Sequence, residues 1–169
     1  MNIVLIGFRG SGKTTVGKIL SERSGMDFID TDKLVERKMG ISIPEIVARY
    51  GWPFFRELEK KVISEVAKTD FKIIAAGGGA VLDAENVQAL KQNGFIIWLK
   101  ADLKIISARL AKDDVTVAQR PSLTGKGTLA EIEEVFRDRE AIYAHSAMME
   151  IDTTNLDAEM VAEKILTLL

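Results

Sequence analysis

The glycine-rich stretch at residues 7–14 has residue types and spacing that can bind the phosphates of a nucleotide. It reads G-F-R-G-S-G-K-T and matches the pattern G-x-x-x-x-G-K-[ST]. Its inner glycines let backbone N–H groups approach phosphate oxygens, and the helix expected to follow points its positive end at the same anion. Lys13 can then reach the β- and γ-phosphates, and the Thr14 hydroxyl can ligate Mg²⁺. The apolar run at 3–6, directly before the loop, favours this interpretation over a chance glycine-rich turn.

Two carboxylates, Asp30 and Asp32, stand at the end of a short predicted strand at 28–30. Ligands of a parallel sheet bind beyond the carboxyl ends of its strands, which places both carboxylates near the phosphate-binding loop. One could hold the hydration shell of Mg²⁺, and the other could accept a proton from the hydroxyl of an acceptor. The spacing alone leaves a second interpretation equally open, a polar strand end in which Asp32 caps a helix.

Three consecutive glycines at 77–79 follow another apolar run, at 73–75. Three glycines lose much conformational entropy when the chain folds, so their presence indicates that the backbone approaches a ligand closely. A simple loop is the alternative interpretation. Arg56 and Arg139 fall on segments expected to be helical, where each alone could be a solvated surface charge.

The segment 112–127 breaks the alternation of apolar runs and helical patterns. It contains Arg120, Pro121 and two glycines but little apolar periodicity. A loop of this length inside a compact domain is either a functional lid or a solvated surface segment. As part of a lid, Arg120 could fold over a phosphoryl group during its transfer.

Composition excludes several classes of function. The 169 residues suit one domain, and a net charge of −2 offers no cationic excess to nucleic acid. The absence of cysteine excludes disulfides, thiolate zinc sites and thiol nucleophiles, and fits a reducing compartment. The motifs D-x-x-G and N/T-K-x-D of GTPases are absent. No apolar stretch is long enough for a signal peptide or a membrane span, so we expect a cytoplasmic protein that acts on small molecules.

The elements that must position these residues alternate along the chain. Apolar runs predict strands at 3–6, 28–30, 73–75, 95–99 and 148–151, and apolar residues at helical spacing predict helices at 14–24, 42–50, 55–66, 128–144 and 161–168. The second of these helices opens with a capping box, Ser42-x-x-Glu45. Continuous apolar strands separated by helices indicate an α/β fold with a parallel sheet of about five strands, covered on both faces.

Six motifs, in this order along nearly the whole chain, resemble those of the shikimate kinase family. They are the phosphate-binding loop at 7–15, D-T-D at 30–32, F-R-x-x-E at 55–59, G-G-G at 77–79, R-P at 120–121 and R-x-x-x-Y at 139–143. The resemblance implies a P-loop NTPase three-layer fold of the nucleoside monophosphate kinase type with a mobile lid. It also implies one kinase domain over 1–169, with an acceptor-binding region at about 32–60 and the lid at about 112–124. The implied reaction is ATP-dependent phosphorylation of the 3-hydroxyl of shikimate by a monomer.

The resemblance also implies a role for each matching residue. ATP would contact Gly10, Ser11, Gly12, Lys13, Thr14, Thr15, Arg109 and Arg120, and shikimate would contact Asp32, Arg56, Gly77, Gly78, Gly79 and Arg139. Lys13 and Arg120 would stabilise charge on the moving phosphoryl group, and Asp32 would act as the base. Thr14 would bind Mg²⁺ directly and Asp30 through water.

Some positions depart from the family pattern. Trp52 stands where an acidic residue is common, Ser122 stands where leucine is common, and 153–156 has no basic residue for the adenine side. Arg9 could approach the γ-phosphate or be solvated. Two other functions remain open at this point. One is another small-molecule kinase, such as a gluconate or nucleoside monophosphate kinase, and the other is a nucleotide-binding module without turnover.

Overall fold

The sheet at the centre of the computed structural model has five parallel strands. The structure describes residues 1–112 and 128–169. The strands are β1 (Asn2–Ile6), β2 (Asp27–Asp30), β3 (Lys72–Ala75), β4 (Gly94–Lys100) and β5 (Met149–Asp152). Their order is β2-β3-β1-β4-β5, and every neighbouring pair is parallel. The predicted five-stranded parallel sheet is therefore confirmed.

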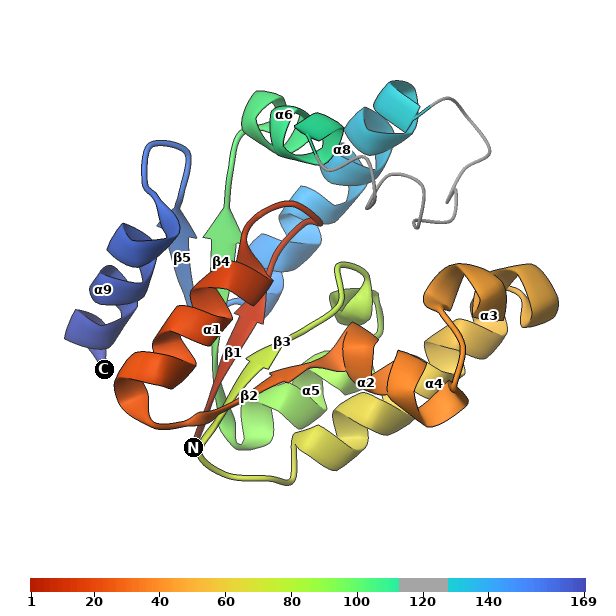
Figure 1. Ribbon diagram of the computed structural model, residues 1–169, viewed down its shortest axis with the longest axis horizontal. Coiled ribbons are helices and arrows are strands. Elements are labelled where there is room, and N and C mark those ends of the chain that lie inside the picture. The colour runs from red at the N-terminus through yellow and green to blue at the C-terminus, as the bar shows by residue number, and fades with distance from the viewer. Residues whose placement is uncertain (113–127) are drawn as a thin grey trace.

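Helices cover both faces of this sheet (Figure 1). They are α1 (Lys13–Ser24), α2 (Thr31–Met39), α3 (Ile43–Tyr50), α4 (Trp52–Val66), α5 (Ala84–Gln92), α6 (Leu103–Lys112), α8 (Thr128–Ser146) and α9 (Ala158–Leu168), with a short 3₁₀ helix η1 (Ala80–Leu82). Helices α1 and α9 lie on one face, and α5 and α8 lie on the other. No helix in the described part of the chain is long and apolar enough to cross a membrane.

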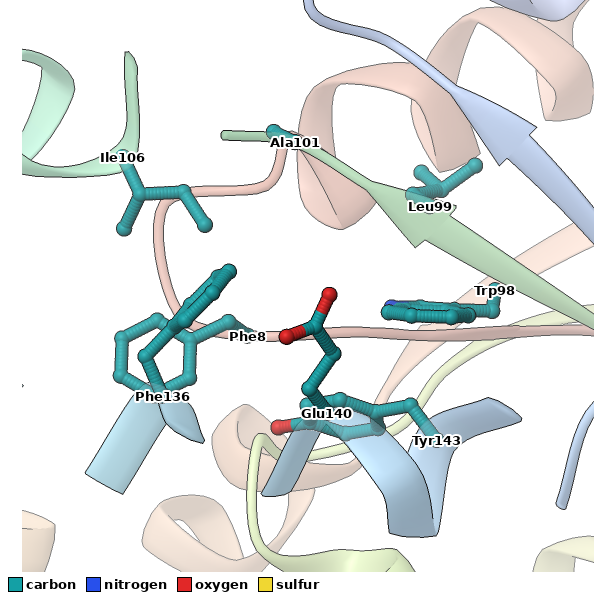
Figure 2. Close-up of a pocket in the computed structure, with 8 residues that line it drawn as sticks. All are labelled: Phe8, Trp98, Leu99, Ala101, Ile106, Phe136, Glu140 and Tyr143. Carbon is teal, nitrogen blue, oxygen red and sulfur yellow. The ribbon is translucent and has the colours of Figure 1, made fainter. Parts of the chain in front are cut away.

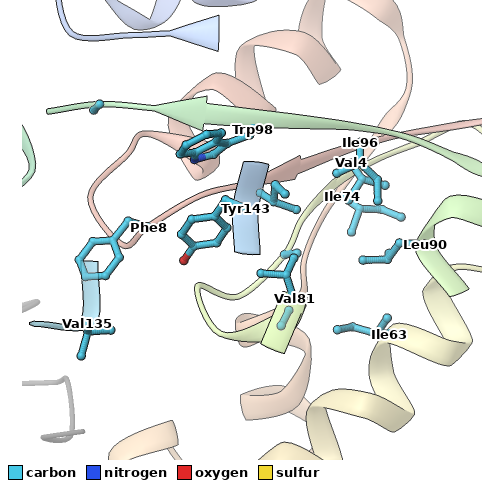
Figure 3. Packing of buried hydrophobic residues seen from close by; sticks show 14 of the residues in the cluster. Val4, Phe8, Ile63, Ile74, Val81, Leu90, Ile96, Trp98, Val135 and Tyr143 are labelled. Atoms are coloured by element: carbon cyan, nitrogen blue, oxygen red, sulfur yellow. The ribbon is translucent and has the colours of Figure 1, made fainter. Parts of the chain in front are cut away.

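The central strand β1 shows why its residues are apolar without interruption. Side chains of a strand alternate between the two faces of the sheet, and both faces of β1 are covered. Ile3 and Leu5 pack with α1 and α9, whereas Val4 and Ile6 pack with α4, α5, α6 and α8. Figure 3 shows Val4 in this second cluster, beside neighbouring strands and the helices that cover them. Burial on both faces fixes the carboxyl end of β1, from which the phosphate-binding loop starts.

Helices α2, α3 and α4 form a lobe beside the sheet with a small core of its own (Figure 1). Val35, Ile46, Phe55 and Val62 form that core. The predicted cap at Ser42 is confirmed, since its side chain accepts a hydrogen bond from the backbone N–H of Glu45. This lobe carries the motif at 55–59 and nearly all of the motif at 30–32, and α4 also packs against the sheet through Ile63 and Val66.

Candidate active site

The phosphate-binding loop joins β1 to α1 in the conformation that its glycines permit. Gly10 and Gly12 have φ angles of +80° and +95°, in the left-handed region that favours glycine. Gly12 caps α1 without a side-chain hydrogen bond, so the first N–H groups of the helix face the loop. The Nζ of Lys13 donates to the carbonyl oxygens of Gly7 (2.7 Å) and Phe8 (3.0 Å). The lysine thus lies along the concave side of the loop, where phosphates would compete with these carbonyls.

Thr14 and Asp30 lie side by side at the edge of this loop. The Thr14 hydroxyl donates to Asp30 Oδ2 at 3.1 Å, and Asp30 Oδ1 accepts from the backbone N–H groups of Asp32 and Lys33. Asp30 therefore caps α2, and the alternative in which Asp32 is the cap is wrong. Hydroxyl and carboxylate oxygens are the donors that Mg²⁺ prefers, so this pair fits that ion. In residues 1–112 and 128–169, no cluster of three or more acidic, histidine or cysteine side chains could hold a metal by itself.

Asp32 faces two other carboxylates from the first turn of α2. Burial raises its pKa to about 7, with further contributions from the negative charges of Glu59 and Asp30. The positive charges of Lys13 and Arg56 act in the opposite direction but do not cancel the rise. A carboxylate with this pKa is partly protonated near neutral pH, which is the range in which a general base operates best.

Gly77 lies beside both Asp32 and Glu59, where a larger residue would displace their carboxylates. An added Cβ would collide with Asp32 Oδ1 and would lie 2.9 Å from Glu59 Oε2. The backbone N–H of Gly77 donates to the buried hydroxyl of Thr31 at 3.0 Å, which holds the segment in place. The two carboxylates consequently lie close together, on the side of the backbone where a side chain of residue 77 would be.

The guanidinium groups of Arg56 and Arg139 converge on the next two glycines. An added Cβ at Gly79 would collide with the Arg56 guanidinium, and one at Gly78 would lie 3.5 Å from Arg139 Nη1. Arg139 is 8% exposed, which rules out a freely solvated charge. These arginines, one from α4 and one from α8, therefore lie beside the same glycine segment. Two guanidinium groups beside one glycine segment can bind a carboxylate.

Glu59 is a member of this site that sequence reasoning named only as part of a motif. It is 1% exposed, and its Oε1 accepts from Arg56 Nη1 at 2.8 Å. Its Oε2 is buried without a hydrogen-bond partner, and burial raises its pKa. The signal in the sequence was its position three residues after Arg56, which puts the two side chains on one helix face.

Tyr143, in the last motif, anchors the glycine segment from α8. Its hydroxyl donates to the carbonyl oxygen of Gly78, and its ring stacks against Trp98 with centroids 5.9 Å apart. Burial raises the pKa of Tyr143 to about 12, so the hydroxyl stays protonated and keeps donating. Tyr143 also lines a narrow, mostly apolar pocket beneath the loop, into which Glu140 points (Figure 2). None of the predicted acceptor residues lines this pocket, so it is not the acceptor site.

Arg9 belongs to the phosphate-binding loop and lies beside the glycine segment at 77–79. Its backbone nitrogen is 3.6 Å from the position of an added Cβ at Gly78, and its Nε is buried without a hydrogen-bond partner. Burial lowers its pKa, and the positive charge of Arg139 lowers it further. The alternative in which Arg9 is freely solvated is therefore wrong.

Arg109 and Arg120 are the two predicted ATP contacts that lie outside the phosphate-binding loop in the sequence. Arg109 Nη1 donates to the carbonyl oxygen of Gly10 at 3.2 Å, which brings this arginine against the phosphate-binding loop. Arg120, Pro121 and Ser122 lie outside the described residues, as does nearly all of the predicted lid at 112–124.

Comparison with known proteins gives one consistent result. A family model described as shikimate kinase matches residues 9–169. The shikimate kinase of Oleidesulfovibrio alaskensis is 42% identical over 167 residues, covering 99% of this chain and 96% of that protein. The shikimate kinase of Moorella thermoacetica is 43% identical over 164 residues, covering 97% and 91%.

Superposition on solved structures leads to the same family. Shikimate kinase from Acinetobacter baumannii in complex with shikimate superposes with a TM-score of 0.91 at 35% identity, covering 99% of this chain and 91% of that one. Shikimate kinase from Aquifex aeolicus superposes with a TM-score of 0.81 at 30% identity, covering 99% and 94%. The predicted P-loop α/β fold is confirmed by these superpositions.

Proposed function

The chain belongs to the shikimate kinase family, and we propose which of its residues carry out the ATP-dependent phosphorylation of shikimate at the 3-hydroxyl. ATP and shikimate are the small-molecule substrates of this kinase. The observation that carries the proposal is the convergence of Arg56 and Arg139 on the glycine segment, with Asp32 at its near end. In that arrangement the two arginines can bind the carboxylate of shikimate, and Asp32 can accept a proton from its hydroxyl.

The nucleotide binds at the N-terminus of α1. Backbone N–H groups of residues 10–15 surround the β-phosphate, and Lys13 exchanges its two carbonyl partners for β- and γ-phosphate oxygens. Thr14 would hold Mg²⁺ directly and Asp30 would hold it through water, and the ion would neutralise part of the phosphate charge. Arg109 flanks the adenine, a role supported by its hydrogen bond to the carbonyl oxygen of Gly10 in the phosphate-binding loop.

Shikimate binds between the lobe of α2–α4 and the glycine segment. Arg56 and Arg139 hold its carboxylate, and the backbone of residues 77–79 contacts its ring. Asp32 accepts a hydrogen bond from the acceptor hydroxyl and takes its proton as the phosphoryl group arrives. Lys13 and Arg120 stabilise the charge on the moving phosphoryl group, as the R-P motif at 120–121 implies.

We also propose that residues 1–169 form one kinase domain that acts as a monomer in the cytoplasm, with its acceptor region at about 32–60 and its lid at about 112–124. The small core that α2, α3 and α4 share supports an acceptor region over these helices. Light scattering of the purified protein tests the monomer, and a dimer at micromolar concentration would contradict it.

An acceptor panel tests the function directly. Purified protein with ATP and Mg²⁺ should phosphorylate shikimate and should leave gluconate and nucleoside monophosphates unchanged. Omission of Mg²⁺ should abolish turnover. Transfer to AMP at a comparable rate would overturn the assignment of Arg56 and Arg139 to an acceptor carboxylate, and transfer to gluconate at a comparable rate would overturn the assignment of shikimate as the acceptor.

A further inference from the structure

The guanidinium of Arg56 lies in a corner formed by two aromatic rings of its own helix. Its Cζ is 5.3 Å from the centroid of the Trp52 ring and 5.3 Å from that of Phe55. The two rings are nearly perpendicular, at 79°, with centroids 5.8 Å apart. Residues 52, 55, 56 and 59 share one face of α4 because of helical spacing, so the first turns of one helix build the whole corner.

Aromatic rings and a carboxylate make different demands on a guanidinium. Its five N–H donors lie in its plane, whereas a ring attracts the cation over its face. Glu59 Oε1 takes a bond from Nη1, and the Nη2 side lies against Gly79. The ring contacts of Arg56 therefore leave its in-plane donors available for a ligand at the glycine segment.

Trp52 and Phe55 differ in how deeply they are buried. Phe55 is 3% exposed and belongs to the core of the α2–α4 lobe. Trp52 packs against the edge of that core and remains partly accessible. The Arg56 side chain is itself 30% exposed, so protein does not enclose it on all sides. A long, partly exposed side chain such as Arg56 can adopt other rotamers that point into solvent. Contact with the Trp52 ring disfavours those rotamers.

We propose that Trp52 is a positioning residue for the acceptor carboxylate, acting through the guanidinium of Arg56. The inference rests on the proposed function, in which Arg56 binds the carboxylate of shikimate. Trp52 holds Arg56 with its in-plane donors toward the glycine segment before shikimate arrives. It thereby sets the affinity for shikimate and has no part in phosphoryl transfer. The residue at position 52 then distinguishes this chain from relatives with an acidic residue there, in which a charge would have to hold the arginine.

The test compares Trp52→Leu with Trp52→Phe and with the control Phe54→Leu. Phe54 is an exposed aromatic residue on the same helix whose ring contacts Tyr50, at 4.6 Å. A cation–π contact at a partly exposed site corresponds to about a two- to fivefold change in binding, and loss of preorganisation adds to it. We expect Trp52→Leu to raise the KM and Kd for shikimate about three- to tenfold, with kcat and the KM for ATP within about twofold of wild type. Trp52→Phe should fall between, and Phe54→Leu should match wild type.

A double-mutant cycle with Arg56→Met separates positioning from simple packing. In the Arg56→Met background, Trp52→Leu should change kcat/KM for shikimate by less than about twofold, because no guanidinium remains to be positioned. The same cycle, measured by urea unfolding, should show coupling between residues 52 and 56. Circular dichroism of each variant checks that the fold is retained.

Two results would overturn the inference while leaving the proposed function intact. One is wild-type affinity for shikimate in a folded Trp52→Leu variant. The other is an equal loss of kcat/KM from Trp52→Leu with and without Arg56. If the wild-type protein bound no shikimate at all, the proposed function would fail and this inference with it. An absence of coupling in the unfolding cycle would contradict the contact itself.

Discussion

Asp32 and Glu59 are two carboxylates that lie together beside Gly77, and their proximity has a chemical consequence. Burial and the negative charge of Glu59 raise the cost of ionising Asp32, so that its pKa rises to about 7. A base of this strength can take a hydroxyl proton near neutral pH, whereas an ordinary aspartate is too weak.

The first prediction concerns the pH dependence of activity. The base form of Asp32 is the deprotonated one, so kcat/KM for shikimate should rise as the pH increases through about 7 and then level off. Glu59→Gln removes one negative charge but keeps an oxygen for Arg56, so it should move the inflection to lower pH. Steady-state rates from pH 5 to 9 measure both curves. An unchanged inflection in Glu59→Gln would show that Glu59 does not act on Asp32.

The second prediction concerns stability, which should fall with increasing pH because of Asp32, whereas activity should rise. Because the folded-state pKa of Asp32 is above its unfolded value near 3.9, the folded state binds the extra proton between pH 4 and 7. Stability is therefore lost as the pH rises through this window. Asp32→Asn removes this cost, and we expect its Tm to exceed that of wild type at pH 8 by a few degrees and by less at pH 5. A lower Tm at pH 8 would contradict the desolvation of Asp32.

At the scale of elements, two short backbone segments form the site, one before α1 and one after β3. Each is rich in glycine for a different physical reason. In the phosphate-binding loop the glycines adopt positive φ angles, whereas at 77–79 they leave room for charged side chains. The two segments follow neighbouring parallel strands, so their chemistry meets at one edge of the sheet.

Lys13 belongs to the first of these segments, and its removal should abolish transfer. Lys13→Ala deletes the cation that approaches the β- and γ-phosphates, and loss of such a stabilising group costs about 10²–10³ in rate or more. We expect kcat to fall by at least that factor while circular dichroism remains that of the wild type. Near-normal turnover would contradict the assignment of this loop.

Gly79→Ala tests the second segment. The new Cβ would occupy the place of the Arg56 guanidinium, whereas a Cβ at Gly78 meets only ordinary contacts of 3.5 Å or more. We expect Gly79→Ala to raise the KM for shikimate at least about tenfold, since a charge-assisted bond is worth about 1.5–3 kcal/mol. The Tm of Gly79→Ala should fall and that of Gly78→Ala should stay within about 2 °C of wild type, which calorimetry measures. Equal Tm values in the two variants would contradict this packing.

At the scale of the whole molecule, the acceptor site exists because α4 and α8 approach the same glycines from different layers. Arg56 comes from the lobe beside the sheet and Arg139 from the helix across its face (Figure 1). A neutral acceptor would leave both cations without a carboxylate in a partly closed site.

Acid and amide forms of the acceptor should therefore differ. We expect the wild type to use the amide of shikimate with a kcat/KM about 10²-fold or more below that for shikimate, if each lost charged bond is worth about 1.5–3 kcal/mol. Arg139→Ala should reduce this discrimination, and Asp32→Asn should abolish turnover of both acceptors. Equal use of acid and amide by the wild type would point instead to a neutral polyol as substrate.

The phosphate-binding loop, the strands and the order of motifs could be predicted from the sequence because each depends on neighbours along the chain. A glycine-rich turn between an apolar run and a helix defines its own geometry, and so does the capping box at Ser42. Burial on both faces made the strands readable as uninterrupted apolar runs.

Tertiary structure decided the rest, because the relevant contacts join residues far apart in the sequence. Spacing left open whether Asp32 is a base or a helix cap, and whether Arg56 and Arg139 are solvated. The structure shows that Asp30 is the cap of α2 and that both arginines pack against residues 77–79. The pKa of Asp32 likewise depends on burial and on Glu59 across Gly77, which no local pattern records. Desolvation and charge coupling arise only when the layers come together, so the strength of the base belongs to the folded molecule.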